Sequence, residues 1–541
     1  MNRREFLGTS AALAAAGCTK GEAPPPPGDL LTTNHAAGHR LRDGGLPAAS
    51  ETRRVKVAIV GAGLSGLAAA WRLRRAGFSD FELLELESAP GGNARWGENA
   101  VSKYPWGSHY IPLPTRESRS LRLLLAELGV LQGDPEAEVA RYDERALVQA
   151  PQERLYRDGT WTDRVAPLAG RSPSELAEWE RFQRRMSEFQ RLRGKDGRRA
   201  FAIPVEYSSR DPALLALDKI TMEGWLRAEG FNSDTVHWVA NYACRDDFGC
   251  EHRDASAWAG IHYFACRVGA AEHADREAVL TWPEGNGFVV RELMERYKFA
   301  LTPGAMVHRM EESAKGVALE VFLTRESRSI RIEAERVVWA APFGFAARAL
   351  VNAPSALAAS LRGYDYAPWI TANLTLSEPP YPHVGAPLSW DNVLYDGPSL
   401  GYVVATHQGL SARPGPTVLT WYLPLAGEPP AVARKRLLET PRLRWAAMAF
   451  AELSSPHPEM RSITQRVDVF ANGHAMVRPV PGRIWGEERR TIVGHRGRVH
   501  FAHADASGLS LIEEATDRGV MAAESVLAAF GVRSSTMRWN S

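Results

Sequence analysis

Three glycines near the start of the chain follow one another at intervals of two and three residues. Gly61, Gly63 and Gly66 form the pattern GxGxxG, and a β-prone apolar run leads directly into it. In such a turn the first glycine permits a tight bend, the second lets the backbone approach a pyrophosphate, and the third lets a helix pack closely. The residues expected to hold a nucleotide here are Gly61, Gly63, Leu64, Ser65 and Gly66.

A carboxylate follows the glycine turn at a distance of about twenty residues. Glu85 ends a second β-prone run at residues 81–85, so it is placed to accept hydrogen bonds from ribose hydroxyls. The turn and the carboxylate together predict a nucleotide site. They do not separate FAD from NAD, because both present the same ADP half to such a loop.

These residues need a strand before the turn and a helix after it. Residues 55–60 form the continuous apolar run expected of a parallel strand that is buried on both faces. A helical pattern then runs from Leu64 to about Ala76, and Gly77 ends it. The first-turn amides of that helix offer a site for the negatively charged pyrophosphate.

Length and composition limit the classes of protein to consider. A chain of 541 residues is too long for one hydrophobic core, so two closely packed domains are expected. The 65 basic and 63 acidic residues nearly cancel, which leaves no overall field to attract nucleic acid. Three of the four cysteines, Cys244, Cys250 and Cys266, fit no zinc pattern and are expected to be buried thiols.

The first fifty residues have the layout of an export signal followed by a linker. Arg3 and Arg4 precede a short stretch of small and apolar residues, which resembles a twin-arginine signal, and the residues before Cys18 resemble a lipoprotein processing site. We therefore expect a periplasmic or envelope-anchored protein, with membrane attachment through a lipidated Cys18. Residues 19–51 are polar and rich in proline, so an extended tether is expected, with folding beginning near Arg53. A disordered arm with chance arginines is the alternative.

Three separated blocks resemble the flavin-containing amine oxidases and their phytoene desaturase relatives. Residues 85–96 read ELESAPGGNARW, like the segment after the second strand of that family. Residues 497–527 are similar to its terminal flavin motif, and residues 287–342 to its middle flavin segment. The blocks cover about a third of the chain and follow one another in the family's order.

The resemblance implies that the nucleotide is FAD, bound without a covalent link because no cysteine lies near the terminal motif. It places the Gly91–Gly92 pair and the residues after it at the flavin phosphates, and residues 106–110 at the flavin ring. It also assigns the adenine contact to the backbone of Val307 and the ribityl or phosphate oxygens to Asp505. The cofactor residues implied in this way are Gly91, Gly92, Asn93, Arg95, Gly107, Ser108, Val307, Asp505, Leu511 and Ile512.

The fold expected from these blocks is an α/β fold. It combines a Rossmann-like FAD-binding domain, built on a parallel sheet, with an interleaved α+β substrate domain. The expected divisions are a signal and linker at 1–52, a discontinuous FAD-binding domain at 53–114, 283–342 and 483–541, and a substrate domain at 115–282 and 343–482. Aromatic runs in the substrate regions suit either a cavity or a core.

The resemblance implies an FAD-dependent oxidase or dehydrogenase that takes hydride from an amine or another small organic substrate. His109 is the catalytic candidate, because its segment would reach the ring and imidazole titrates near neutral pH; a purely structural histidine is the alternative. The expected strand at 369–376 lacks the lysine that amine oxidases often carry. Two other functions therefore stay open: a phytoene desaturase or isomerase-like enzyme acting on an apolar substrate, and an anchored binding protein that retains FAD without turnover. The electron acceptor, whether oxygen, a quinone or a protein, also stays open.

Overall fold

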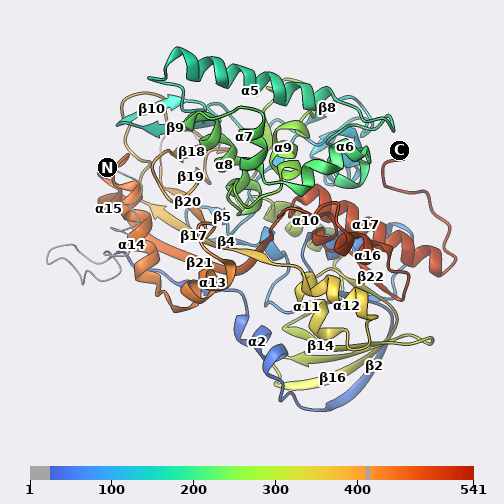
Figure 1. Cartoon of the computed structure of the whole chain (residues 1–541). Helices are drawn as coiled ribbons and strands as arrows, with labels where there is room; N and C mark the ends of the chain where they lie inside the picture. Colours follow the sequence, from blue (N-terminus) through green and yellow to red (C-terminus); the bar gives the residue numbers. More distant parts are fainter. Residues whose placement is uncertain (1–24, 410–414, 541) are drawn as a thin grey trace.

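The computed structural model describes residues 25–409 and 415–540, and two large sheets organise them (Figure 1). Arg3, Arg4 and Cys18, on which the expected export signal depends, lie outside the described residues. The predicted α/β class with a parallel, Rossmann-like sheet is confirmed. Within the part described, no helix is long and apolar enough to cross a membrane.

The first sheet has seven strands in the order β13-β3-β2-β16-β15-β14, with β22 beside β16. Neighbours among β13, β3, β2, β16 and β22 are parallel, whereas β14, β15 and β16 form an antiparallel meander. The strands are β2 (Ala49–Val60), β3 (Phe81–Glu85), β13 (Leu301–Pro303), β14 (Ala305–Glu312), β15 (Val317–Leu323), β16 (Arg328–Trp339) and β22 (Val499–Phe501).

Helices cover both faces of this sheet, and the alternation of side chains along β2 shows how. Val57 and Ile59 are buried against one set of helices, while Ala58 and Val60 are buried against another. Burial on both faces explains why the run at 55–60 is continuously apolar. The first set is α3 (Leu64–Arg75), α4 (Arg119–Glu127), α10 (Gly287–Tyr297) and α17 (Ile512–Ala529); the second is α11 (Phe343–Ala349), α12 (Ser355–Arg362) and α16 (Glu487–Gly494).

The second sheet has eight strands in the order β1-β21-β17-β20-β19-β18-β9-β10. Along β17, Ile370, Ala372 and Leu374 pack with helices on one side, which leaves Thr371 facing the other side. The strands are β1 (Leu30–Thr32), β9 (Glu153–Arg157), β10 (Thr160–Asp163), β17 (Tyr366–Leu376), β18 (Asp391–Leu394), β19 (Tyr402–Val404), β20 (Thr417–Pro424) and β21 (Thr464–Val477). The covering helices are α13 (Pro430–Glu439), α14 (Arg442–Leu453) and α15 (Met460–Ile463).

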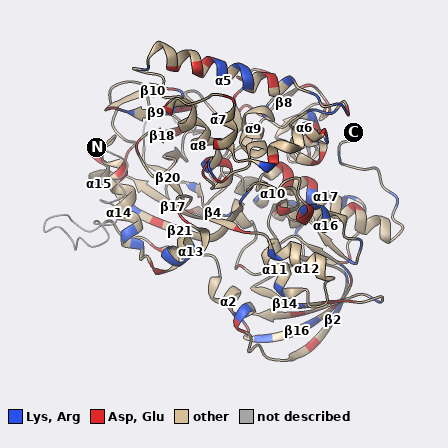
Figure 2. Cartoon of the chain, in the orientation of Figure 1, with Lys and Arg blue, Asp and Glu red and all other residues tan. Residues whose placement is uncertain are grey.

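A helical layer completes the molecule. It contains α5 (Pro173–Arg191), α6 (Pro212–Leu215), α7 (Met222–Ala228), α8 (Asp234–Phe248) and α9 (Ala257–Ala265). An aromatic core that includes Phe182, Trp225 and Trp258 holds these helices together. The outermost helix, α5, carries both acidic and basic residues along its length (Figure 2). Cys244, Cys250 and Cys266 are free and buried, as predicted.

The remaining short elements connect these layers. They are α2 (His35–Asp43), β4 (Trp96–Glu98), β5 (Lys103–Pro105), β6 (Ile111–Pro112), β7 (Leu131–Gln132), β8 (Val139–Tyr142), β11 (Ala270–Ala271) and β12 (Val279–Leu280). β6 directly follows residues 106–110 and pairs with β12. This pairing fixes the C-terminal end of residues 106–110.

The expected extended tether is wrong for residues 25–51, which form β1, α2 and the start of β2. Leu30 and Leu31 stay 39% and 37% exposed, so apolar burial does not explain why β1 is ordered. The segment is held instead by backbone pairing to the edge of β21, with Asp29 also accepting from the guanidinium of Arg466 at 2.5 Å. The expected domain boundary at residue 342 is also too early, because α11 and α12 pack on the first sheet.

Candidate functional site

The turn between β2 and α3 is built so closely that two of its glycines are required by the fold itself. Gly61 has a φ of +99°, and a Cβ at this position would lie 3.0 Å from the backbone of Ala340 and Ala341. A Cβ on Gly66 would lie 1.9 Å from the carbonyl oxygen of Gly61. Side chains at either position would therefore push α3 away from the sheet.

Gly63 differs, because the protein leaves space around it. A Cβ there would contact only the Cα of Gly92, at 3.8 Å. Gly63 caps α3 without a side-chain hydrogen bond and forms a parallel bridge with Gly91, whose N–H donates to Ala62 at 2.9 Å. The two glycine segments thus lie side by side at the N-terminus of α3 and form a backbone cradle. The helix dipole and the first-turn amides favour an anion there.

Glu85 lies at the expected end of β3, directly beside this cradle. Its carboxylate accepts the N–H groups of Ala62 at 2.7 Å and Glu87 at 2.9 Å. Burial raises the pKa of Glu85, and the two backbone donors act in the opposite direction. A carboxylate has about four acceptor positions, so these bonds leave capacity for ribose hydroxyls. The predicted ribose contact stays a prediction.

Arg95 also lies next to the cradle, but its guanidinium is already paired. It donates to Glu87 at 3.0 Å and lies over the ring of Phe470 at 5.3 Å. The contact with flavin phosphates that the resemblance implies therefore competes with this ion pair. Val307 is buried on β14, beside an irregularity in its pairing with β15, and its predicted adenine contact is likewise untested.

Asp505 is fully buried in a network of protein partners. Its carboxylate accepts from the hydroxyl of Tyr366 at 2.6 Å and the N–H of Phe343 at 2.9 Å, and it lies 2.9 Å from the ring of His503. Burial would raise the pKa of Asp505, but these neighbours together hold it below its ordinary value. The carboxylate thus joins α11 and β17 beside the pocket rather than lining it, and the predicted contact with flavin oxygens stays a prediction.

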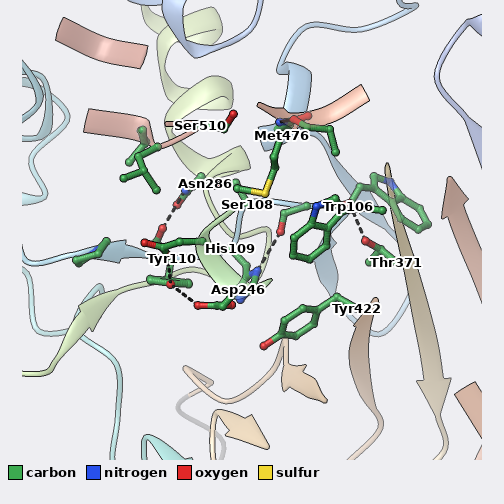
Figure 3. A pocket seen from close by; sticks show the side chains of 18 of the residues that line it. Trp106, Ser108, His109, Tyr110, Asp246, Asn286, Thr371, Tyr422, Met476 and Ser510 are labelled. Carbon is green, nitrogen blue, oxygen red and sulfur yellow. Dashed lines mark hydrogen bonds between the residues drawn. The ribbon is translucent and has the colours of Figure 1, made fainter. Parts of the chain in front are cut away.

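A pocket whose outline encloses about 1070 Å³, including solvent-open space, lies between the two sheets and the helical layer (Figure 3). Residues 510–513 at the start of α17 form one wall, and Leu511 caps this helix without a side-chain hydrogen bond. Six predicted site residues line the pocket together: Asn93, Gly107, Ser108, His109, Leu511 and Ile512. Because Asn93 directly follows the Gly91–Gly92 pair, the pocket begins where the cradle ends.

The segment that carries His109 is fixed at several points. Ser108 donates its N–H to the carbonyl of Asn93 at 2.9 Å, and Asn286 donates to the carbonyl of Tyr110 at 3.0 Å. On the other side, the hydroxyl of Thr371 donates to the carbonyl of Trp106 at 3.1 Å. These bonds hold residues 106–110 across the pocket, and Figure 3 draws those of Asn286 and Thr371 as dashed lines.

His109 projects into the pocket among aromatic rings. Its Nδ1 lies 3.0 Å from the carbonyl oxygen of Gly107, and its ring centroid lies 5.0 Å from that of Tyr422 and 5.8 Å from that of Trp390. A carbonyl can only accept, so Nδ1 carries the hydrogen and Nε2 is the acceptor. Burial lowers the pKa of His109 to about 4, which leaves the ring neutral at neutral pH.

The structure also brings together carboxyl groups that the sequence reasoning did not assign to the site. Asp246 and Asp247, in the last turn of α8, both lie within hydrogen-bond distance of the hydroxyl of Tyr110, at 3.0 and 3.3 Å. Arg267 donates to Asp247 at 2.5 Å and to Tyr110 at 3.3 Å. The adjacent acids on one helix end were a signal, but only the fold shows that they face Tyr110 and Arg267.

A third acid of the pocket, Glu513, lies in the first turn of α17. Burial raises the pKa of Glu513 to about 8 and that of Asp247 to about 6. Behind the pocket wall, Asp391 accepts from Tyr422 at 3.2 Å, and its pKa is also raised by burial. Among the described residues that line the pocket, three carboxyl groups accompany one guanidinium and no lysine. An excess of buried acids favours the binding of a cation, because added positive charge stabilises their ionised forms.

Comparisons with known proteins agree with this architecture. Residues 59–128 match the family described as an NAD(P)-binding Rossmann-like domain. Similar solved structures include putrescine oxidase bound to putrescine, with a TM-score of 0.64 and 16% identity over 88% of this chain and 100% of that chain. Cyclohexylamine oxidase from Brevibacterium oxydans IH-35A has a TM-score of 0.63 and 18% identity over 88% and 99%.

A fatty acid isomerase from P. acnes, which produces CLA, is also similar, with a TM-score of 0.59 and 13% identity over 88% of this chain and 98% of that chain. No curated protein matches the sequence. At such identities the likeness shows a common fold, and the chemistry has to be argued from the site.

Proposed function

We propose that this chain is an FAD-dependent oxidoreductase that binds a small amine, which enters as a cation, and takes hydride from the carbon next to its nitrogen after that nitrogen has lost its extra proton. One observation carries the proposal: the cradle at the N-terminus of α3 is continuous with the pocket at the N-terminus of α17. The cradle at α3 leads through Asn93 into the pocket, where the N-terminus of α17 forms the wall. A dinucleotide with a ring at one end matches both sites.

The residues fit FAD in this arrangement. The glycine turn and the Gly91–Gly92 pair would hold the pyrophosphate, Glu85 the ribose, and the amides near Leu511 and Ile512 the ring. Bound FAD would supply the electron chemistry by accepting two electrons as hydride. The protein then has to place the substrate, exclude water and handle a proton.

The pocket residues suit those tasks. Trp106, Phe470 and Tyr422 supply aromatic surface that excludes water. Asp246 lies at the end of the pocket formed by α8 and can pair with a substrate ammonium group, while the neutral His109 can accept a hydrogen bond from a substrate N–H through Nε2. Thr371, on β17, uses its hydroxyl to hold Trp106.

The experiment is anaerobic reduction of the purified protein by monoamines, diamines and neutral apolar donors. Replacing the charge with Asp246→Asn should lower kcat/KM for the best amine by about tenfold or more, since a buried charged hydrogen bond contributes about 1.5–3 kcal/mol. Asp234→Asn, at the exposed start of the same helix, is the control and should have no effect. Equal rates in all three proteins, or reduction by apolar donors alone, would contradict the proposal of an amine substrate.

We further propose that the protein is exported through its paired arginines and anchored through Cys18. The support is the order of charged, apolar and small residues at 2–18. Changing Arg3→Lys and Arg4→Lys together should leave the protein in the cytoplasmic fraction. Unchanged export of this double variant would contradict the twin-arginine assignment.

A further inference from the structure

A second cluster of polar side chains lies on the helical layer, away from the residues that line the pocket. It consists of Glu223 on α7, His237 on α8 and His252 in the loop after α8, and each is partly exposed. One nitrogen or oxygen atom from each residue lies within 4.8 Å of the others. The N–H of Glu223 donates to the carbonyl of His252 at 2.9 Å, so the loop is fixed against α7.

The outer nitrogen of each histidine is committed to donating a hydrogen. His237 Nε2 lies 3.0 Å from the carbonyl oxygen of Phe231, which can only accept. His252 Nδ1 lies 3.0 Å from Oδ1 of Asn241. The backbone N–H of His252 also donates to this atom at 3.0 Å, which identifies it as the oxygen rather than the nitrogen of the amide. Both outer nitrogens therefore carry hydrogen.

When both rings are neutral, the two inner nitrogens therefore present lone pairs to each other. His237 Nδ1 and His252 Nε2 are 3.1 Å apart. Two facing lone pairs repel each other, but a metal ion bound between the two nitrogens accepts both lone pairs and makes the arrangement favourable. Two imidazole ligands at about 2.0–2.1 Å from a tetrahedral zinc ion are about 3.3 Å apart, close to the spacing observed.

The surroundings of the cluster resemble those of a metal site. Metal-binding histidines usually donate their outer N–H to a carbonyl or carboxylate oxygen, as both do here, and ligating carboxylates are themselves hydrogen-bonded. Glu223 accepts from Arg227 at 2.8 Å, which orients its carboxylate. Two imidazoles and one carboxylate favour zinc over magnesium or calcium, which prefer oxygen ligands.

We propose that Glu223, His237 and His252 bind a zinc ion that ties α7, α8 and the following loop together, with water as the fourth ligand. The site does not depend on the proposed flavin function. α8 carries His237 in its first turn and Asp246 in its last, so the zinc ion fixes the helix that forms one end of the pocket.

A second group of similar composition provides a matched contrast. His383, His457 and Glu459 also lie within 4.8 Å of one another. The hydroxyl of Tyr402, however, accepts from Arg154 at 3.1 Å and lies 2.6 Å from His457 Nε2, so this nitrogen is already engaged by a protein partner. When Tyr402 donates to Nε2, His457 Nδ1, which lies 3.7 Å from Glu459, carries the ring hydrogen and has no lone pair for a metal.

The experiment is titration of the full-length, tag-free protein with zinc after chelator treatment. We expect one zinc ion per chain, tetrahedral absorption bands when cobalt(II) replaces zinc, and a thermal midpoint that rises with zinc concentration. His237→Ala should abolish all three effects. Asn241→Ala, which removes the acceptor that orients His252, should lower the zinc affinity about 10–100-fold.

Two further variants keep the outcome interpretable. Glu223→Gln changes a partly exposed side chain, so it should fold even if His237→Ala does not, and it should weaken zinc binding at least about tenfold. His383→Ala should bind zinc like the unaltered chain. FAD content should be the same in every variant. Absence of saturable zinc binding, or equal binding in Glu223→Gln and the unaltered protein, would overturn the proposal.

Discussion

At the scale of single residues, the glycines of the cradle have separable tasks. Gly61 and Gly66 are required because the chain itself occupies the space of a side chain. Gly63 is different, since a Cβ would fit the protein at 3.8 Å from its nearest neighbour, and only a larger group would fill the cradle. A substitution at Gly63 can therefore remove nucleotide binding while the protein still folds.

Gly63→Val should give a folded protein that does not retain FAD, because the valine methyl groups would enter the pyrophosphate space. The measurement is the ratio of flavin absorption to protein absorption after purification, together with circular dichroism. Gly494→Val is the control, since nothing lies within 4 Å of a Cβ at Gly494. A flavin-loaded Gly63→Val protein would remove the cradle assignment.

Glu513 should make stability depend on pH. Burial raises its pKa from the ordinary 4.5 to about 8, so the folded chain keeps a proton that the unfolded chain releases. Its contribution is fully present below about pH 4.5 and is lost as pH rises toward about 8, with a slope of at most about 1.4 kcal/mol per pH unit.

Glu513→Gln, which is neutral at every pH, should therefore show a smaller fall of thermal midpoint between about pH 5 and 8 than the unaltered protein. Differential scanning calorimetry across this range measures the difference. The exposed Glu144→Gln change is the control and should keep the original slope. Identical slopes for the Glu513 variant and the unaltered protein would contradict the raised pKa.

The predictability of the site also depends on single residues. Gly61, Gly66 and Glu85 could be placed from the sequence because each lies within a local motif of fixed spacing. Asp246 and Glu513 could not, because they come from helices far apart in the chain and acquire shifted pKa values only when burial and neighbours act on them. Their chemistry is a property of the folded pocket.

At the scale of elements, the contact between α3 and α17 joins the two ends of the nucleotide site. A Cβ on Gly519 of α17 would lie 2.2 Å from the carbonyl oxygen of Ser65 on α3. Both helices start at predicted anion or ring sites, so their separation sets the distance between those sites. The sequence predicted each helix, but the contact between them depends on tertiary packing.

Gly519→Ala should force the two helices apart and lower the thermal midpoint by several degrees, with weaker FAD retention, because overpacking typically costs about 1–3 kcal/mol. Ser525→Ala, on the exposed side of α17, should leave both properties unchanged. Thermal unfolding with and without added FAD measures the effect. A Gly519→Ala protein as stable as the original would show that this contact does not set the spacing.

β1 shows why one element escaped prediction. Sequence patterns report the burial of side chains, whereas β1 is an edge strand whose order comes from backbone hydrogen bonds to β21. β2, in the other sheet, was predicted only from residue 55, because that part is apolar. The structure extends β2 back to Ala49, where the residues are polar and exposed.

At the scale of the whole molecule, the chain passes repeatedly between the two sheets. The first sheet collects strands from residues 49–85, 301–339 and 499–501, and the second collects most of its strands from the stretches between them. The pocket lies where these layers meet, so its walls come from both sheets and from the helical layer. The α/β class could be predicted from local patterns. The way in which the two sheets and the helical layer together form the pocket walls could not.

The central claim is that the cradle and the pocket together hold FAD. The most direct measurement is an absorption spectrum of the purified protein, followed by denaturation and identification of any cofactor that is released. The account predicts a yellow protein that releases FAD, close to one molecule per chain, without proteolysis. A colourless protein that cannot be reconstituted with FAD would contradict it.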